Sequence, residues 1–323
     1  MKVVVTGAGG FLGRPVVQRL LQRGHEVRAV VRPASTHPVW PGVEVVRADL
    51  RTEPDLTSVV AASGAVVHLA AATDGDEDSQ FASSVVGTER LLDAMASQET
   101  KRLLLVSSLV VYDWNRARGA MDERTPLAQD IYGMGAYTIA KVWQERVVLR
   151  KAASLGLQLT VLRPGFIWGA GRAEIAGMGR VMGRAYVLVG PTTRLPLTHV
   201  ENCADCVVAA LENPGSVGEV FNVVDDDRIR VWRYAREHAR GTHKRGIPIP
   251  IPYWLGLALA HLAATTSRVL FGRKGKLPSL LTPRRFEAQF KPLRYSSRKL
   301  RETLGWRPPL AFADCLERTY RSR

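Results

Sequence analysis

The hydrophobic residues of the first half of the chain follow two alternating patterns. Short runs rich in Val, Leu and Ala predict strands at residues 2–5, 27–31, 43–47, 65–69, 102–107 and 158–163. Apolar residues spaced three and four apart predict helices at 11–23, 56–62, 81–97 and 137–155. Because this alternation is typical of βαβ units, we predict an α/β fold with a Rossmann-type, doubly wound parallel sheet. Its ligand crevice is expected at the carboxyl ends of the strands.

The pattern becomes less regular after Pro164. A helix at 200–211 and a strand at 219–223 are predicted to rejoin the sheet. We therefore predict a dinucleotide-binding domain and a smaller, mostly C-terminal substrate-binding lobe. The domain takes residues 1–165 and 200–225, and the lobe takes 166–199 and 226–323.

The first predicted strand runs into a glycine-rich turn, TGAGGFLG at residues 6–13, and a helix follows. Gly7 permits the tight turn, Gly10 lets a pyrophosphate approach the backbone, and Gly13 allows close contact between helix and strand. The N-terminus of the helix favours the anion. This context favours a dinucleotide site over a glycine turn without a ligand.

The end of the second strand bears on which dinucleotide binds. A cofactor with a free ribose 2′-hydroxyl calls for a carboxylate near this point, whereas a 2′-phosphate calls for an arginine. The chain has Val31 followed by Arg32, with Arg14 in the glycine turn as a second cation. NADP(H) is therefore favoured over NAD(H).

Two further groups follow successive strands. Asp49, after the third strand, is suited to accept a hydrogen bond from the adenine amino group. After the fourth strand, Leu69, Ala70 and Ala71 include small side chains that let a dinucleotide lie close to the backbone. We predict that both groups contact the cofactor.

A serine, a tyrosine and a lysine form the candidate catalytic group. Tyr137 and Lys141 are four residues apart on a predicted helix and so share a face, while Ser108 follows the fifth strand. We expect the Lys141 ammonium to lower the pKa of the Tyr137 phenol. Ser108 would hydrogen-bond the substrate oxygen while Tyr137 transfers the proton and a nicotinamide transfers hydride.

These motifs resemble the extended short-chain dehydrogenases/reductases, the NAD(P)-dependent epimerase/dehydratase family. The resemblance covers nearly the whole chain and rests on TGAGGFLG at 6–13, HLAA at 68–71, SSLVVY at 107–112, YTIAK at 137–141, RPGFIWG at 163–169, PLTHVENCAD at 196–205 and LGWRP at 304–308. It implies that Ser108, Tyr137 and Lys141 form the catalytic triad. It also implies cofactor contacts from Phe11, Leu12, Leu50, Tyr137, Lys141, Pro164, Gly165, Phe166 and Ile167. One departure is Ser84, where the family usually has asparagine.

Charge is distributed unevenly along the chain. The last 98 residues hold 22 basic and 7 acidic side chains, whereas residues 1–225 hold 23 of each. The net charge of +15 therefore comes entirely from the last 98 residues. Within that part, residues 247–267 carry no formal charge. Basic residues flank this segment: Lys244, Arg245, Arg268, Arg273 and Lys274.

Three interpretations of the apolar segment 247–267 stay open: a helix in the core of the lobe, a cover over the substrate, or a contact with an anionic membrane surface. Its early prolines and His261 favour an amphipathic or substrate-covering helix over a membrane span. The layout is similar to the 3β-hydroxysteroid dehydrogenase-like branch of the family. That similarity implies an NADP(H)-dependent enzyme that interconverts a secondary alcohol and a ketone on a bulky apolar substrate, sterol-like or acyl.

The sequence also leaves other functions and partners open. The alternatives are an NAD-dependent sugar epimerase and a non-catalytic, NADP-sensing binding protein. The basic excess would also suit an acidic substrate, while no pattern of a nucleic-acid-binding module is present. A homodimer stays open. The chain has three cysteines and starts directly with a strand, so we expect a cytoplasmic protein. Cys203 and Cys206 are expected in the core rather than on a metal.

Overall fold

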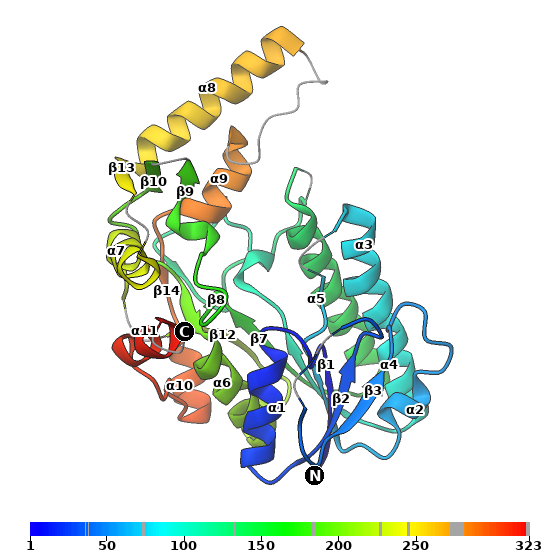
Figure 1. Ribbon diagram of the computed structural model, residues 1–323. Helices are drawn as coiled ribbons and strands as arrows, with labels where there is room; N and C mark the ends of the chain where they lie inside the picture. The colour runs from blue at the N-terminus through cyan, green and yellow to red at the C-terminus, as the bar shows by residue number, and fades with distance from the viewer. Residues whose placement is uncertain are drawn as a thin grey trace.

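A seven-stranded sheet forms the centre of the molecule (Figure 1). The computed structural model describes residues 1–35, 37, 39–72, 75–131, 133–182, 185–225, 228–243, 246–271 and 281–320. The strands of the sheet are β1 (Lys2–Thr6), β2 (Glu26–Val31), β3 (Glu44–Arg47), β4 (Ala65–His68), β5 (Arg102–Val106), β7 (Gln158–Pro164) and β12 (Val220–Val223). Their order is β12-β7-β5-β4-β1-β2-β3, and every neighbouring pair is parallel. The predicted α/β fold class is confirmed.

Helices cover both faces of the sheet because its strands are apolar on both sides. The helices of this part are α1 (Gly13–Gln22), α2 (Thr57–Val60), α3 (Glu77–Phe81), α4 (Gly87–Ser97), α5 (Ala136–Leu155), α6 (Val200–Glu212) and α10 (Arg298–Leu304). Val3 and Val5 of β1 pack with α1, α6 and α10 on one face. Val4 points to the opposite face, where α2, α4 and α5 lie. The alternation along a strand thus divides the core into two layers.

The helix predicted at 81–97 is divided in two. α3 ends at Phe81, a π-helical turn occupies Ala82–Val86, and α4 starts at Gly87. Ser84, the position that departs from the family pattern, lies in this turn, and its buried hydroxyl accepts a hydrogen bond from the Ala72 amide at 3.4 Å. The π turn therefore joins the helix to the loop after β4, one of the loops predicted to contact the cofactor.

A second lobe, mostly from the C-terminal part of the chain, contains small sheets and, among the described residues, four helices. Its strands are β6 (Ala120–Met121), β8 (Phe166–Trp168), β9 (Arg180–Met182), β10 (Ala185–Val189), β11 (Leu197–His199), β13 (Ile247–Ile251) and β14 (Arg294–Tyr295). Its helices are α7 (Val231–Thr242), α8 (Tyr253–Phe271), α9 (Pro283–Phe290) and α11 (Phe312–Tyr320), with single 3₁₀ turns elsewhere in the chain at Leu109–Val111, Ala176–Met178 and Pro214–Ser216. Trp168 is fully buried at the centre of the lobe, with its ring 5.3 Å from that of Tyr234 and 5.6 Å from that of Phe312.

The apolar segment 247–267 is not the single helix that its sequence predicts. Its first five residues, IPIPI, form β13, which pairs with β10, and α8 begins after Pro252. Prolines at alternate positions cannot enter a helix interior but are tolerated on an edge strand, which explains the difference. Of the predicted flanking basic residues, Lys244, Arg245, Arg273 and Lys274 lie outside the described residues. Among the described residues, no helix is long and apolar enough to cross a membrane.

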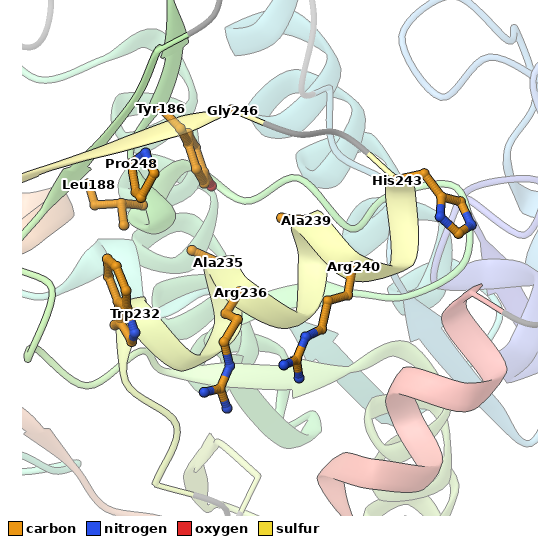
Figure 2. Close-up of a pocket in the computed structure, with 10 residues that line it drawn as sticks. All are labelled: Tyr186, Leu188, Trp232, Ala235, Arg236, Ala239, Arg240, His243, Gly246 and Pro248. Atoms are coloured by element: carbon orange, nitrogen blue, oxygen red, sulfur yellow. The ribbon is translucent and has the colours of Figure 1, made fainter.

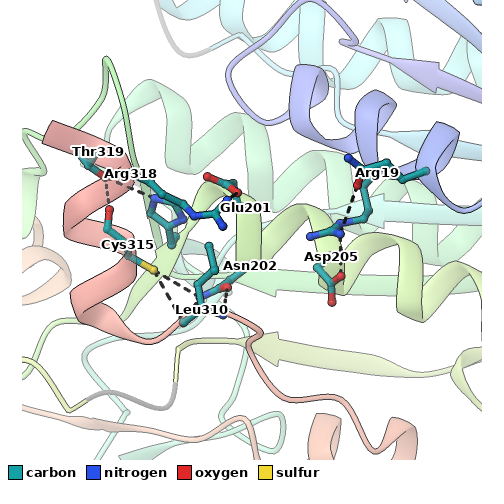
Figure 3. A network of polar contacts seen from close by, with 10 residues as sticks. Arg19, Glu201, Asn202, Asp205, Leu310, Cys315, Arg318 and Thr319 are labelled. Atoms are coloured by element: carbon teal, nitrogen blue, oxygen red, sulfur yellow. Dashed lines mark hydrogen bonds and ion pairs between the residues drawn. The ribbon is translucent and has the colours of Figure 1, made fainter. Parts of the chain in front are cut away.

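α6 connects the sheet to the C-terminal segment (Figure 3). The Asn202 side chain exchanges two hydrogen bonds of 3.0 Å with the backbone of Leu310, and Glu201 pairs with Arg318 of α11 at 2.5 Å. Asp205, one turn further along α6, pairs with Arg19 of α1 at 3.4 Å. Cys203 and Cys206 face the core and are buried, as expected. The described residues contain no cluster of three or more potential metal ligands.

Candidate active site

The glycine turn between β1 and α1 has the shape that a pyrophosphate requires. Gly7 has a φ of +71°, and a Cβ at this position would lie 2.9 Å from the Ala70 amide nitrogen. A Cβ at Gly13 would overlap the Gly7 carbonyl. α1 begins with neither a side-chain cap nor an acidic residue in its first turn, within the described chain. The open N-terminus and the bare backbone of the turn therefore fit the anionic bridge of a dinucleotide.

The contact at Gly13 makes a testable prediction. The variant Gly13→Ala must displace the Gly7 carbonyl, so we expect the affinity for the cofactor to fall by about tenfold or more, while the protein stays folded. Gly64→Ala is the matched control, because a Cβ at Gly64 meets ordinary contacts at 3.6 Å. Fluorescence titration with NADPH and NADH measures both variants, and an unchanged affinity in Gly13→Ala would contradict the prediction.

The other predicted cofactor residues lie at the carboxyl ends of neighbouring strands. Arg32 follows β2 and is exposed, and Leu69, Ala70 and Ala71 follow β4. The carboxylate of Asp49 accepts hydrogen bonds from Nε and Nη2 of the Arg51 guanidinium, the shortest at 2.7 Å, and this contact holds the pKa of Asp49 below its usual range. Leu50 packs next to Gly87 at the start of α4.

Ser108 and Tyr137 line one cavity of about 590 Å³. Pro164, Gly165, Phe166 and Ile167 form one wall of the cavity. Apolar side chains form much of the remainder: Leu109, Val110, Trp114, Met134, Ile175 and Ala288. The cavity lies at the carboxyl ends of β5 and β7, as predicted for the crevice of a parallel sheet.

Ser108 is the hydrogen-bonding neighbour that acts on the Tyr137 phenol, and both side chains line the cavity. Burial raises the pKa of Tyr137, and the bond to Ser108 together with the charge of Arg172 opposes that rise. The sequence predicted that Lys141 lowers the pKa of Tyr137. That prediction is wrong in direction, because the pKa is raised. Loss of hydration disfavours the phenolate, and the cation that acts on the phenol is Arg172.

Lys141 has other partners. Its ammonium donates to the carbonyl of Val106 at 3.0 Å and to the Gln144 side chain at 2.8 Å, and burial lowers its pKa to about 8. The Gln144 amide lies 3.2 Å from the ring of His68, whose pKa burial lowers to about 3. Lys141 thus holds the end of β5, directly before Ser107 and Ser108.

A second buried network lies behind Ser108. Ser107 donates to the Glu145 carboxylate, which forms an ion pair with Arg163, and both side chains of this pair are almost fully buried. Arg163 also donates to the Tyr112 hydroxyl at 2.8 Å, and Tyr112 donates to the Asn222 side chain at 2.7 Å. This network connects α5, β7 and β12, and Ser107 is its one member among the described residues that line the cavity.

Arg172 is a candidate functional residue that the sequence pattern did not indicate. It lines the cavity, and its guanidinium lies 5.8 Å from the centre of the Phe11 ring in the glycine turn. It belongs to the irregular stretch after β8, where no periodicity predicts which side chains turn inward. Arg284 and Arg285 of the helix α9 also line the cavity, and the sequence pattern did not indicate them either, because only the folded chain brings α9 to the carboxyl ends of β5 and β7.

Comparisons with known proteins agree with this geometry. Residues 3–223 match the model of the NAD dependent epimerase/dehydratase family. The chain is 28% identical to a 3 beta-hydroxysteroid dehydrogenase/Delta 5-->4-isomerase of Mycobacterium tuberculosis, over 98% of this chain and 89% of that protein. It is 29% identical to a 4-hydroxy-2-methyl-3-oxo-4-farnesyl-3,4-dihydroquinoline-1-oxide ketoreductase of Stigmatella aurantiaca, over 84% and 82% of the two chains. A UDP-glucuronic acid 4-epimerase from Bacillus cereus, solved with NAD, superposes with a TM-score of 0.74 at 18% identity, covering 99% and 98% of the chains.

The family match covers more than half of the chain, so this protein belongs to the NAD-dependent epimerase/dehydratase family, the extended short-chain dehydrogenases/reductases. It is an NAD(P)-dependent oxidoreductase of that family and uses a nicotinamide cofactor.

Proposed function

We propose that this enzyme interconverts a secondary alcohol and a ketone on a bulky apolar substrate, with NADP(H) as the cofactor. The observation that carries the proposal is that Ser108 and Tyr137 lie together at the wall of a cavity whose lining is largely apolar. The similar proteins from Mycobacterium and Stigmatella are named for hydroxysteroid and farnesyl-bearing substrates, both large and apolar. That agreement supports an apolar substrate here.

The proposed chemistry divides between the two hydroxyl groups. When bound, the nicotinamide cofactor supplies hydride in reduction and accepts it in oxidation. Ser108 donates a hydrogen bond to the substrate oxygen, and Tyr137 gives its proton to that oxygen as the ketone becomes an alcohol. The raised pKa of Tyr137 keeps the phenol protonated at neutral pH, which suits this donor role. Lys141 and Gln144 keep the end of β5, and so Ser108, in position.

The rate of alcohol oxidation is expected to depend on pH in the sense opposite to the rate of ketone reduction. Oxidation requires the Tyr137 phenolate, so kcat/KM for oxidation is expected to rise as pH rises toward the raised pKa of this group. Since the bond to Ser108 opposes the rise in pKa, the variant Ser108→Ala should shift the profile to higher pH. Steady-state rates across neutral and alkaline pH provide the measurement, and an oxidation rate that falls over this range would contradict the assignment.

The choice of cofactor gives a separate prediction. Arg32 is exposed at the end of β2, and its charge acts on Asp49 at the end of β3. Arg32→Ala should weaken NADPH binding by about tenfold, the effect of losing one charged contact to a phosphate, and leave NADH binding unchanged. Arg150→Ala, at an exposed arginine within α5, is the control. Equal losses for both cofactors would place Arg32 outside the phosphate site.

A screen of secondary alcohols and ketones tests the proposed reaction itself. Sterols, long-chain acyl ketones and nucleotide sugars are offered with NADPH, NADP⁺, NADH and NAD⁺, and cofactor absorbance is followed. The proposal expects net cofactor consumption with an apolar substrate. Conversion of a nucleotide sugar without net consumption would identify an epimerase, and binding of cofactor without turnover of any substrate would identify a sensing protein.

A further inference from the structure

α8 is an apolar helix of which only one stripe is packed. Gly256 and Ala260 are buried against α9, where the ring of Phe286 fills the space beside Gly256. Most of the remaining surface is exposed and carries large apolar side chains: Trp254, Leu255, Leu259, Leu262, Val269 and Leu270. Figure 1 shows α8 projecting beyond the rest of the lobe. Leu255, Leu262 and Val269 are spaced seven apart and lie opposite the packed stripe, since seven residues make about two helical turns.

The apolar surface continues onto β13. Ile247 and Ile249 are 69% and 44% exposed, and β13 is the edge strand of its sheet. The Ile251 carbonyl accepts a hydrogen bond from the Gly190 amide. The backbone polar groups of the odd-numbered residues of β13 therefore point toward β10, and those of Pro248 and Pro250 point to the open edge of the sheet. Proline has no N–H, so this edge disfavours the addition of a strand from another protein chain.

Basic residues of α7 adjoin the same strand. Figure 2 shows Trp232, Arg236 and Arg240 of α7 around a hollow of about 750 Å³ that Pro248 of β13 also lines. One carboxylate, Glu237, lies 3.2 Å from each of the two guanidiniums, so this group keeps a net positive charge. Arg228 and Arg230 lie in a second hollow, which Trp232 and Pro250 share.

We propose that α8, β13 and the basic side of α7 form a docking surface for an anionic lipid bilayer, with α8 lying in the membrane interface. We name this the α8–β13–α7 surface. Burying leucine, valine and isoleucine side chains at the boundary of the acyl chains is favourable because it removes apolar surface from water. Tryptophan side chains favour the membrane–water interface, and the arginines complement the negative charge of the lipid phosphates. A second copy of this chain would instead bring the same arginines together and would meet the proline edge. α9 packs on α8 and lines the candidate active-site cavity, so docking would place that wall near the lipid.

Vesicle flotation of the full-length protein tests the apolar part of the surface. Vesicles contain phosphatidylcholine alone, or with about one third phosphatidylserine. The wild type is expected to float with the anionic vesicles. Leu255→Asn combined with Leu262→Asn should lower the partition coefficient by about tenfold or more, whereas Val39→Asn, at a 90% exposed position elsewhere, should bind like the wild type. Unchanged circular dichroism and thermal unfolding establish that each variant is folded.

A charge variant tests the basic part. Arg236→Gln combined with Arg240→Gln should weaken binding to anionic vesicles and leave binding to phosphatidylcholine alone unchanged, with Arg150→Gln as the control. The proposal is overturned if the wild type does not float with anionic vesicles at low salt, or if the double leucine variant floats equally well. It is also overturned if sedimentation velocity shows a dimer that the leucine substitutions convert to a monomer, because the surface would then serve a second copy. These readouts do not use activity, so they are independent of the proposed reaction.

Discussion

Tyr137→Phe should lower kcat by about a thousandfold, within the range found when a proton-transferring side chain is removed. The phenyl ring keeps the packing of the cavity, but no proton can pass to the substrate oxygen. Because Tyr137 lies at the cavity wall beside Ser108, the loss of its hydroxyl is not expected to disturb the glycine turn. Cofactor affinity should therefore remain near that of the wild type, while turnover of the best substrate from the screen is lost.

Tyr295→Phe is the matched control for this experiment. Tyr295 is a partly buried tyrosine that does not itself line the cavity; it packs with Leu293 and against Trp114, which does line the cavity. The control should keep full activity. If Tyr137→Phe does so too, Tyr137 is not the acid of this reaction, and a solvent molecule must supply the proton.

Much of the fold could be predicted from the sequence because the central strands are apolar on both faces. Buried runs such as that of β5 differ plainly from the amphipathic helices around them, and β12 returns to the sheet at the predicted position. The small sheets of the lobe could not be predicted, since their strands are short and pair across long separations. β6 and β14, for example, pair although more than 170 residues lie between them.

The candidate site divides in a similar way. The sequence could locate Ser108, Tyr137 and Lys141 because each lies in or directly after a strand or helix whose hydrophobic pattern is clear. In the structure, Ser108 and Tyr137 lie together. The direction of the Tyr137 pKa could not be predicted, because burial is decided by tertiary packing rather than by the neighbour four residues away. Arg172 was missed because only the folded chain brings it to Phe11 and Tyr137.

Arg163→Met is expected to give the largest loss of stability, lowering the free energy of unfolding by about 3–5 kcal/mol. The substitution preserves an unbranched side chain but removes the cation that neutralises Glu145, whose side chain is only 2% exposed. The Tyr112 hydroxyl also loses a donor at 2.8 Å. Burying an unpaired carboxylate is costly, and no other cation is within ion-pair distance of Glu145 in the described part of the chain. Urea denaturation monitored by circular dichroism measures the loss.

Two further variants separate the buried pair from a general effect of losing an arginine. Arg124→Met breaks the ion pair with Asp122, but Arg124 is 88% exposed, so the expected change is below about 1 kcal/mol. Arg163→Met combined with Glu145→Leu removes both charges and should regain about 2 kcal/mol relative to Arg163→Met alone, because no buried charge is left without a partner. If the double variant is less stable than Arg163→Met, the cost arises from lost packing and hydrogen bonds rather than from an isolated carboxylate. Recovery would mean that the ion pair between Arg163 and Glu145 owes its effect to mutual neutralisation, with each buried charge tolerated only because the other is present.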